Sequence, residues 1–81
     1  MAESRSECNA RVRRAAEVRR KEVFRLRNEE VRSISNDWRA GFAILKEEND
    51  RRQAANKAFV SEQLAEIAED LRADLGACSL L

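Results

Sequence analysis

The feature that most limits the fold of this chain is an apolar stripe that repeats every eleven residues. Eleven residues make almost three turns of an α-helix, so residues eleven apart lie on one line along a nearly straight helix. Three neighbouring series form the stripe: Val12, Val23, Ile34, Leu45, Asn56, Ile67 and Cys78; Ala16, Arg27, Trp38, Asn49, Val60 and Leu71; and Arg20, Val31, Phe42, Gln53, Leu64 and Leu75. Most of these residues are apolar, and the pattern therefore predicts helix with one apolar face.

The scarcity of helix-breaking residues also favours helix. The 81 residues include no proline and only two glycines, Gly41 and Gly76. We therefore predict an all-α fold, either one long amphipathic helix over residues 5–75 or a two-helix hairpin. Residues 1–4 and 76–81 are the predicted tails, with Gly76 as the stop of the helix. Because so short a chain buries only a modest core, we also expect self-association resembling a coiled coil.

The stripe has one polar interruption, at Asn49, Gln53 and Asn56. This segment is either a turn or a stretch of helix that faces nothing apolar, and Asp50 with Gln53 could form a capping box for a new helix. We favour a helix that is continuous or slightly kinked near residues 49–53. The reason is that alanines follow and that no proline or glycine interrupts the segment.

Gly41 marks a second candidate break. The stripe passes through it without a change of phase, whereas a turn would normally reset the phase. The two cysteines provide a geometric check: in one continuous helix, Cys8 and Cys78 would lie on the order of 100 Å apart, at about 1.5 Å per residue. In a hairpin that turns near Gly41 to Ala43 they would be neighbours. An antiparallel dimer would also bring them together, but between chains, so a disulfide alone does not distinguish the two folds.

A seven-residue pattern competes with the eleven-residue one. Phe24, Val31, Trp38 and Leu45 are spaced by sevens, as in a coiled coil. The next member of that series is Arg52, so the pattern covers less of the chain. We therefore prefer the eleven-residue register.

Charge is unevenly distributed along the chain, although the net charge is only +1. Residues 11–32 are basic and residues 58–75 are acidic, which suits association of copies or docking on a charged array. The alternative function is that of a basic helical nucleic-acid-binding protein. Its candidate contact residues are Arg11, Arg13, Arg14, Arg19, Arg20 and Lys21. Glutamates interleaved at helical spacing pair with this segment within the helix and favour a solvated, salt-bridged helix face instead.

Residues that would carry catalysis or bind a metal are scarce. The chain has no histidine, and its carboxylates are spread along helix faces, so we expect no enzyme activity, no metal site and no cofactor. Cys8 and Cys78 match no metal-binding pattern and are expected to be free thiols in a reducing compartment. No apolar run is long enough to span a bilayer and no signal-peptide core follows Met1, so we expect a cytoplasmic protein that does not bind membranes.

The stripe supplies the candidate binding residues. The main predicted contact consists of Val31, Ile34, Trp38, Phe42 and Leu45, and a second contact consists of Val60, Leu64, Ile67 and Leu71. Trp38 and Phe42 are the expected hot spots, because large aromatic side chains dominate the energetics of most interfaces. These residues predict a non-enzymatic structural or assembly protein that docks on another protein or on its own copies.

Residues 42–75 carry a pattern that also occurs in a known family. In chain order the pattern consists of Phe42, Arg51, Ala55, Phe59, Leu64, Ile67 and Leu71. With these residues the stretch resembles a repeat of gas vesicle protein C, the outer-rib protein of gas vesicles. The resemblance covers under half of the chain. It implies a non-enzymatic amphipathic helix that lies on a protein shell and stiffens it.

Overall fold

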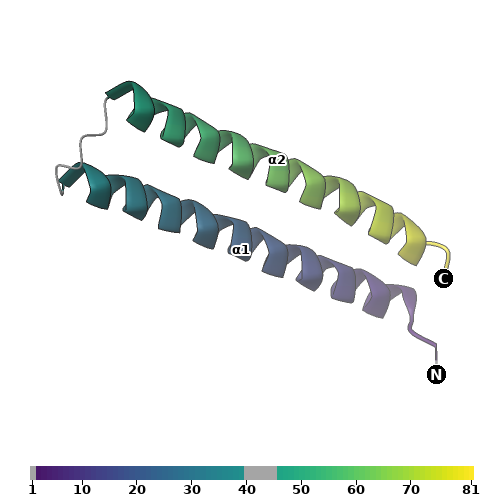
Figure 1. Cartoon of the computed structure of the whole chain (residues 1–81). Helices are drawn as coiled ribbons and strands as arrows, with labels where there is room; N and C mark the ends of the chain where they lie inside the picture. The colour runs from purple at the N-terminus through teal and green to yellow at the C-terminus, as the bar shows by residue number, and fades with distance from the viewer. Residues whose placement is uncertain (1, 40–45) are drawn as a thin grey trace.

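The computed structural model describes residues 2–39 and 46–81, which form an antiparallel pair of helices (Figure 1). Helix α1 spans Arg5–Arg39 and helix α2 spans Lys46–Cys78. The two helices pack along their length, and both chain ends lie at the same end of the pair. The molecule extends over 60 × 17 × 11 Å between Cα atoms.

These elements confirm the all-α fold and the two-helix hairpin, and they show that the single long helix over residues 5–75 is wrong. The physical reason is burial: in a hairpin the two halves of the apolar stripe cover one another, whereas one extended helix would leave the whole stripe in water. The predicted kink near residues 49–53 is wrong as well, because α2 runs through this segment as regular helix. Gly41, the other candidate break, lies outside the described residues.

The helix ends follow local rules. The Ser4 hydroxyl accepts a hydrogen bond from the Glu7 backbone N–H at 3.1 Å, which caps the start of α1. At its other end, α2 continues through Gly76 to Cys78, so the predicted stop at Gly76 is wrong. A solvent-exposed glycine costs a helix only about 1 kcal/mol. Here Cys78 is held against α1, which offsets that cost.

The eleven-residue register describes what is buried. The buried residues of α1 and α2 include five members of one series: Val12, Val23, Ile34, Ile67 and Cys78. Phe24, which belongs to the competing seven-residue series alone, is exposed, whereas Val31 and Trp38 belong to both patterns and are exposed as well. A repeat of eleven keeps the contact line straight along both helices, and the helices can therefore touch over their full length.

Two apolar clusters fill the half of the hairpin that carries the chain ends. One contains Cys8, Val12 and Cys78, and the other is built on Val23 and Ile67. Leu71 packs against both clusters. The core is therefore continuous from the chain ends to the middle of the hairpin.

Cys8 and Cys78 form a disulfide, with their Cα atoms 5.6 Å apart. The prediction of two free thiols is therefore wrong, because neither described cysteine is free. The prediction assumed a reducing compartment and gave the hairpin less weight than the single helix. Once the chain folds back on itself, the antiparallel pairing brings its two cysteines together.

Candidate functional site

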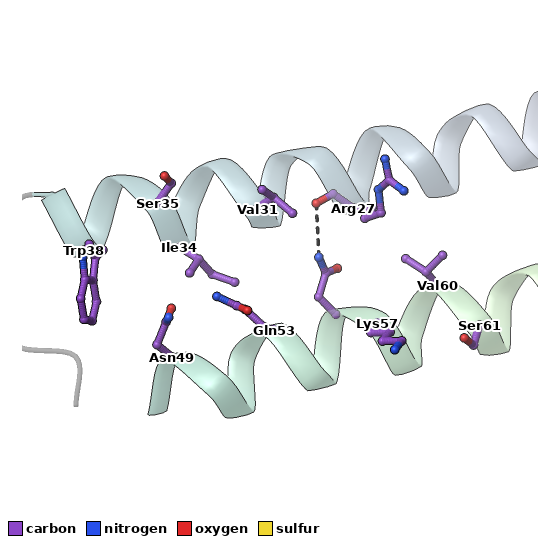
Figure 2. A pocket seen from close by; sticks show the side chains of 11 residues that line it. Arg27, Val31, Ile34, Ser35, Trp38, Asn49, Gln53, Lys57, Val60 and Ser61 are labelled. Carbon is purple, nitrogen blue, oxygen red and sulfur yellow. Dashed lines mark hydrogen bonds between the residues drawn. The ribbon is translucent and has the colours of Figure 1, made fainter. Parts of the chain in front are cut away.

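The half of the hairpin near the turn differs from the half at the chain ends, because its inner surface is partly polar. Here α2 turns Asn49, Gln53 and Asn56 toward α1, and the two helices leave an open groove of about 630 Å³ between them (Figure 2). The groove is lined by Arg27, Val31, Ile34, Ser35, Trp38, Asn49, Gln53, Asn56, Lys57, Val60 and Ser61. This surface is hereafter called the turn-end groove.

Apolar side chains in the turn-end groove come mainly from α1. Ile34 is buried, with 5% of its surface exposed, whereas Val31 and Trp38 are each 55% exposed. Figure 2 shows the Trp38 indole projecting from α1 toward the start of α2. A large aromatic side chain left this exposed on a folded helix pair makes the groove a candidate interaction site.

The polar residues of α2 are unequally satisfied. Asn56 donates a side-chain hydrogen bond to the Arg27 carbonyl oxygen at 3.3 Å (Figure 2), which crosses between the helices. The side-chain oxygen of Asn49 is buried and accepts no hydrogen bond among the described residues. A buried oxygen without a donor destabilises the fold by about 1–3 kcal/mol. The half of the hairpin near the turn is therefore less stable than an apolar core would make it.

The turn-end groove lies on a basic side of the hairpin. Arg27 and Lys57 line it directly, and residues eleven positions from lining residues extend the same side along each helix. This basic face carries Arg13, Arg20, Arg27, Lys46, Lys57 and Arg72, opposed by Glu17 and Asp50. Of the ion pairs among the described residues, Arg20–Glu17 is the one on this face.

Arg27 also contacts an apolar neighbour on the basic face. Its guanidinium carbon lies 5.1 Å from the centre of the Phe24 ring, a cation–π arrangement. The same guanidinium donates a hydrogen bond to the Asn28 side-chain oxygen at 3.1 Å. Arg27 is thus positioned along the rim of the turn-end groove without a carboxylate partner among the residues that the structure describes.

The opposite side of the hairpin is acidic. It holds a shallower groove of about 570 Å³ that includes Leu26, Phe59 and the carboxylates of Glu29 and Glu30. The eleven-residue spacing extends this side along the helices. This acidic face carries Glu22, Glu29, Glu30, Asp37, Glu48, Glu66, Asp70 and Asp74, opposed by Arg11, Arg19 and Arg52.

The basic residues of the acidic face are all occupied by ion pairs. Arg52 of α2 reaches Asp37 at 2.8 Å and Glu30 at 3.1 Å. The hydrogen bonds to Asp37 and Glu30 raise the pKa of Arg52 further above its ordinary value. Near the chain ends, Arg19 pairs with Asp70 at 2.7 Å and Arg11 with Glu3 at 3.0 Å. The ion pairs that connect α1 with α2 therefore lie on the acidic face.

The predicted partner-binding residues are divided by the fold. Val31, Ile34, Trp38 and Val60 meet in the turn-end groove. Ile67, from the second predicted contact, is buried against α1, and Leu64 and Leu71 pack beside it. Phe42 and Leu45 lie outside the described residues.

The fold does not bring the predicted nucleic-acid-binding residues together. Arg13 and Arg20 belong to the basic face, whereas Arg11 and Arg19 belong to the acidic face and are paired there. The remaining two, Arg14 and Lys21, are exposed on α1 away from α2. Six residues that are close in sequence thus point in three directions.

Several residues of the turn-end groove were not predicted as binding residues. Asn49, Gln53 and Asn56 were recognisable, because they interrupt the apolar stripe. Arg27 was recognisable in the same way, because it is a charged residue at a position of the apolar stripe. Nothing in the sequence marked Lys57 and Ser61 as groove residues, since only the pairing of α1 with α2 places them there.

The described residues contain no cluster of side chains that could hold a metal ion, and none of the described helices is long and apolar enough to cross a membrane. Comparisons with protein-family models, with curated proteins and with solved structures found no match for the chain. The function is therefore argued from the grooves and faces of the hairpin.

Proposed function

We propose that this chain is a non-enzymatic interaction protein, in which a disulfide-linked helical hairpin presents the turn-end groove to a partner protein. The observation that carries the proposal is the exposure of Trp38 and Val31, each 55% exposed, above the buried Ile34. Hot spots of protein interfaces are enriched in tryptophan and arginine, and the groove offers both in Trp38 and Arg27.

The form of the groove favours a helix as the bound element. The groove runs between two antiparallel helices, and a third helix laid along it would complete a three-helix arrangement in which Trp38 and Val31 are covered. The bound helix needs apolar side chains for Trp38 and Val31. It also needs carboxylates for Arg27 and Lys57.

A role on a gas-vesicle-like shell is a finer form of this proposal. It rests on the resemblance of residues 42–75 to gas vesicle protein C. In the hairpin, Ile67 and Leu71 of that stretch pack toward α1. A shell would therefore have to contact the exposed Trp38 and Val31, and the helices would act as a stiff pair rather than as one extended rib.

Nucleic-acid binding is the second candidate, and the basic face is the observation that favours it. Arg13, Arg20, Arg27 and Lys57 lie along one side of the hairpin, where phosphate groups could follow them. Trp38 on the same side could stack on an unpaired base. The apolar side chains of Trp38 and Val31 above the buried Ile34 suit a protein helix better than a nucleic acid. We therefore rank binding of a protein partner first.

The cytoplasmic location stays a prediction, and the expectation of free thiols that was drawn from it is wrong. Cys8 and Cys78 are joined. Because cytosolic reductants keep most thiols reduced, a structural disulfide favours an oxidising compartment. We therefore propose that the chain acts where disulfides persist, and non-reducing electrophoresis of protein trapped with a thiol-blocking reagent tests this location.

Site-specific photocrosslinking tests the proposed groove. A photoreactive amino acid at Ser35, which lines the groove, is compared with one at Asn36, which is exposed on the adjacent position of α1 and points elsewhere. In cells of the source organism, we expect protease-sensitive adducts from position 35 that the Trp38→Ala substitution removes, and none from position 36.

Two results would count against the groove. Adducts that a nuclease removes and Trp38→Ala leaves intact would support the nucleic-acid alternative. Equal adducts from positions 35 and 36, or none from either, would contradict a binding site at this surface.

A further inference from the structure

We infer that the partner of the turn-end groove is a second copy of this chain, bound through its acidic face, so that hairpins stack face to back. This inference rests on the proposed function, because it names the occupant of the same groove. It follows from three properties of the two faces: their charge, the position of their exposed apolar residues, and their area.

Charge complementarity is the first property. The rim of the turn-end groove carries Arg27 and Lys57. On the acidic face the arginines are already paired within the chain, and Glu48, Glu66 and Asp74 have no ion pair among the described residues. A basic surface with free cations and an acidic surface with free carboxylates attract one another, and each repels its own kind. Contact of the basic face with itself is therefore disfavoured.

The exposed apolar residues provide the second property. Trp38 and Val31 stand on the basic face, and Leu26 and Phe59 line the groove on the acidic face. Both grooves are built from the same stretch of α1 and α2, and Asn56 lines both of them, so they lie back to back at one level of the hairpin. Trp38 lies twelve residues beyond Leu26 on α1, about 18 Å along the helix. A copy displaced perpendicular to the hairpin plane and shifted by this distance along the helices brings Trp38 of one molecule to Leu26 and Phe59 of the next.

Area is the third property. The hairpin presents a face about 60 Å long and 17 Å wide between Cα atoms. After the shift of about 18 Å along the helices, the two faces still overlap over about 40 Å of this length. A stable interface needs roughly 800 Å² from each partner, and the overlapping part supplies it once side chains widen the face beyond its Cα extent. The straight contact line of the eleven-residue register keeps both faces flat enough for such alignment.

The two contacting surfaces are different surfaces of the same chain, so the association does not stop at two copies. Each added hairpin buries one basic face and exposes another, which is the geometry that generates open stacks. The expected assembly is a column of hairpins whose helices lie across the column axis.

Sedimentation equilibrium of the oxidised protein with two complementary variants tests this stacking. The basic-face variant combines Trp38→Ala with Lys57→Gln, and the acidic-face variant combines Phe59→Ala with Glu66→Gln. All four side chains are exposed, so circular dichroism should confirm an unchanged helix content. Lys21→Gln is the matched control, because it removes one positive charge from a position that lies on neither face.

The stacking makes a specific prediction for the mixture. Wild-type protein and the Lys21→Gln control should grow beyond two copies as the concentration rises, and more strongly at low salt. Each face variant alone should associate about tenfold or more weakly. An equimolar mixture of the two variants should form a dimer and stop there, because each variant retains the one face that the other has lost.

Other outcomes overturn the inference. A wild-type protein that stays monomeric up to millimolar concentration has no stacking contact. An acidic-face variant that still dimerises uses the basic face against itself. A monomer that binds a short DNA duplex through the basic face supports the nucleic-acid alternative. A monomer whose Ser35 position crosslinks to a different protein leaves the proposed groove intact and excludes only the second copy as its partner.

Discussion

The two halves of this hairpin follow one eleven-residue register but fill it with different side chains. At the chain ends, the register positions hold Val12, Val23 and Ile67, and the helices close over them. Near the turn, the same positions of α2 hold Asn49, Gln53 and Asn56, and the helices leave a groove. Identical backbone geometry thus produces a core in one half and an open groove in the other.

The difference between the halves has an energetic reason. Burial of an aliphatic side chain stabilises a fold by about 1.5–3 kcal/mol, whereas burial of an amide gains nothing unless each polar atom finds a partner. The half at the chain ends therefore provides most of the stability. The half near the turn can then expose Trp38, because the disulfide and the apolar clusters hold the helices together elsewhere.

The largest expected effect comes from removing the disulfide. Cys8 and Cys78 are separated by 70 residues in sequence, and a link across so long a loop stabilises the folded state by about 4 kcal/mol in the loop-entropy account. The double substitution Cys8→Ser and Cys78→Ser should lower the free energy of unfolding by about this amount in urea titrations followed by circular dichroism. Wild-type protein in a reducing agent is the control and should behave similarly. An unchanged midpoint would mean that the terminal half is held by its apolar contacts alone.

The next effect compares one isoleucine from each half. Ile67 is 1% exposed and surrounded by apolar side chains, so Ile67→Ala should destabilise the protein by about 3 kcal/mol. Ile34 is also buried, but it lines the turn-end groove, and water can fill the space that Ile34→Ala leaves. We expect a loss of about 1–2 kcal/mol for Ile34→Ala, from transfer of the side chain alone. Equal losses in urea titrations would remove the contrast between the halves.

A smaller effect, of opposite sign, is expected for Asn49 in the half near the turn. Asn49→Leu removes a buried oxygen without a donor and adds apolar surface facing α1, and should stabilise the protein by about 1 kcal/mol. Asn56→Leu is the matched control. It also removes the hydrogen bond to the Arg27 carbonyl, so it should stabilise the protein by less than Asn49→Leu does. If thermal unfolding shows a larger gain for Asn56→Leu, the polar residues of the groove are not distinguished by their hydrogen bonds.

The smallest effect concerns the ion pair at the chain ends. The hydrogen bond from Arg11 lowers the pKa of Glu3 below its usual value of 4.5. A carboxyl whose folded pKa is depressed stabilises the folded state above its unfolded pKa, and the contribution is lost as the pH falls through the folded pKa. Glu3→Gln should therefore shift the urea midpoint slightly downward at neutral pH, and the difference should shrink as the pH falls below 4.5 and disappear once Glu3 is protonated in the folded state. A difference that persists in acid would mean that Glu3 acts through packing instead of charge.

Part of the candidate site followed from the sequence. The spacing of Val31, Ile34 and Trp38 placed them on one face of a helix, and Asn49, Gln53 and Asn56 were recognisable as the point where that face loses its apolar partner. The identity of the exposed residues did not follow, because a stripe position is buried or exposed according to what the opposite helix presents. Trp38 is exposed since α2 places amides near it, and Ile67 is buried since α1 offers Ala16 and Val23.

The distribution of charge was also only partly predictable from the sequence. Along the sequence the chain has a basic segment over residues 11–32 and an acidic one over residues 58–75, which suggests a rod with opposite ends. Folding places these segments side by side, where Arg19 pairs with Asp70. The separation of charge that remains lies across the hairpin, between the basic and acidic faces, and depends on the rotation of each helix about its axis.

The sequence by itself determined that the chain is helical and which line along each helix is apolar. Both properties are local, because they arise from helix propensity and from the repeat of eleven residues. The tertiary structure decided that the chain folds back on itself, that Cys8 meets Cys78, and that a groove opens beside Trp38. One stripe can be covered by its own other half or by another molecule with nearly equal burial, so local pattern alone does not distinguish these states. The choice depends on contacts between residues far apart in the chain.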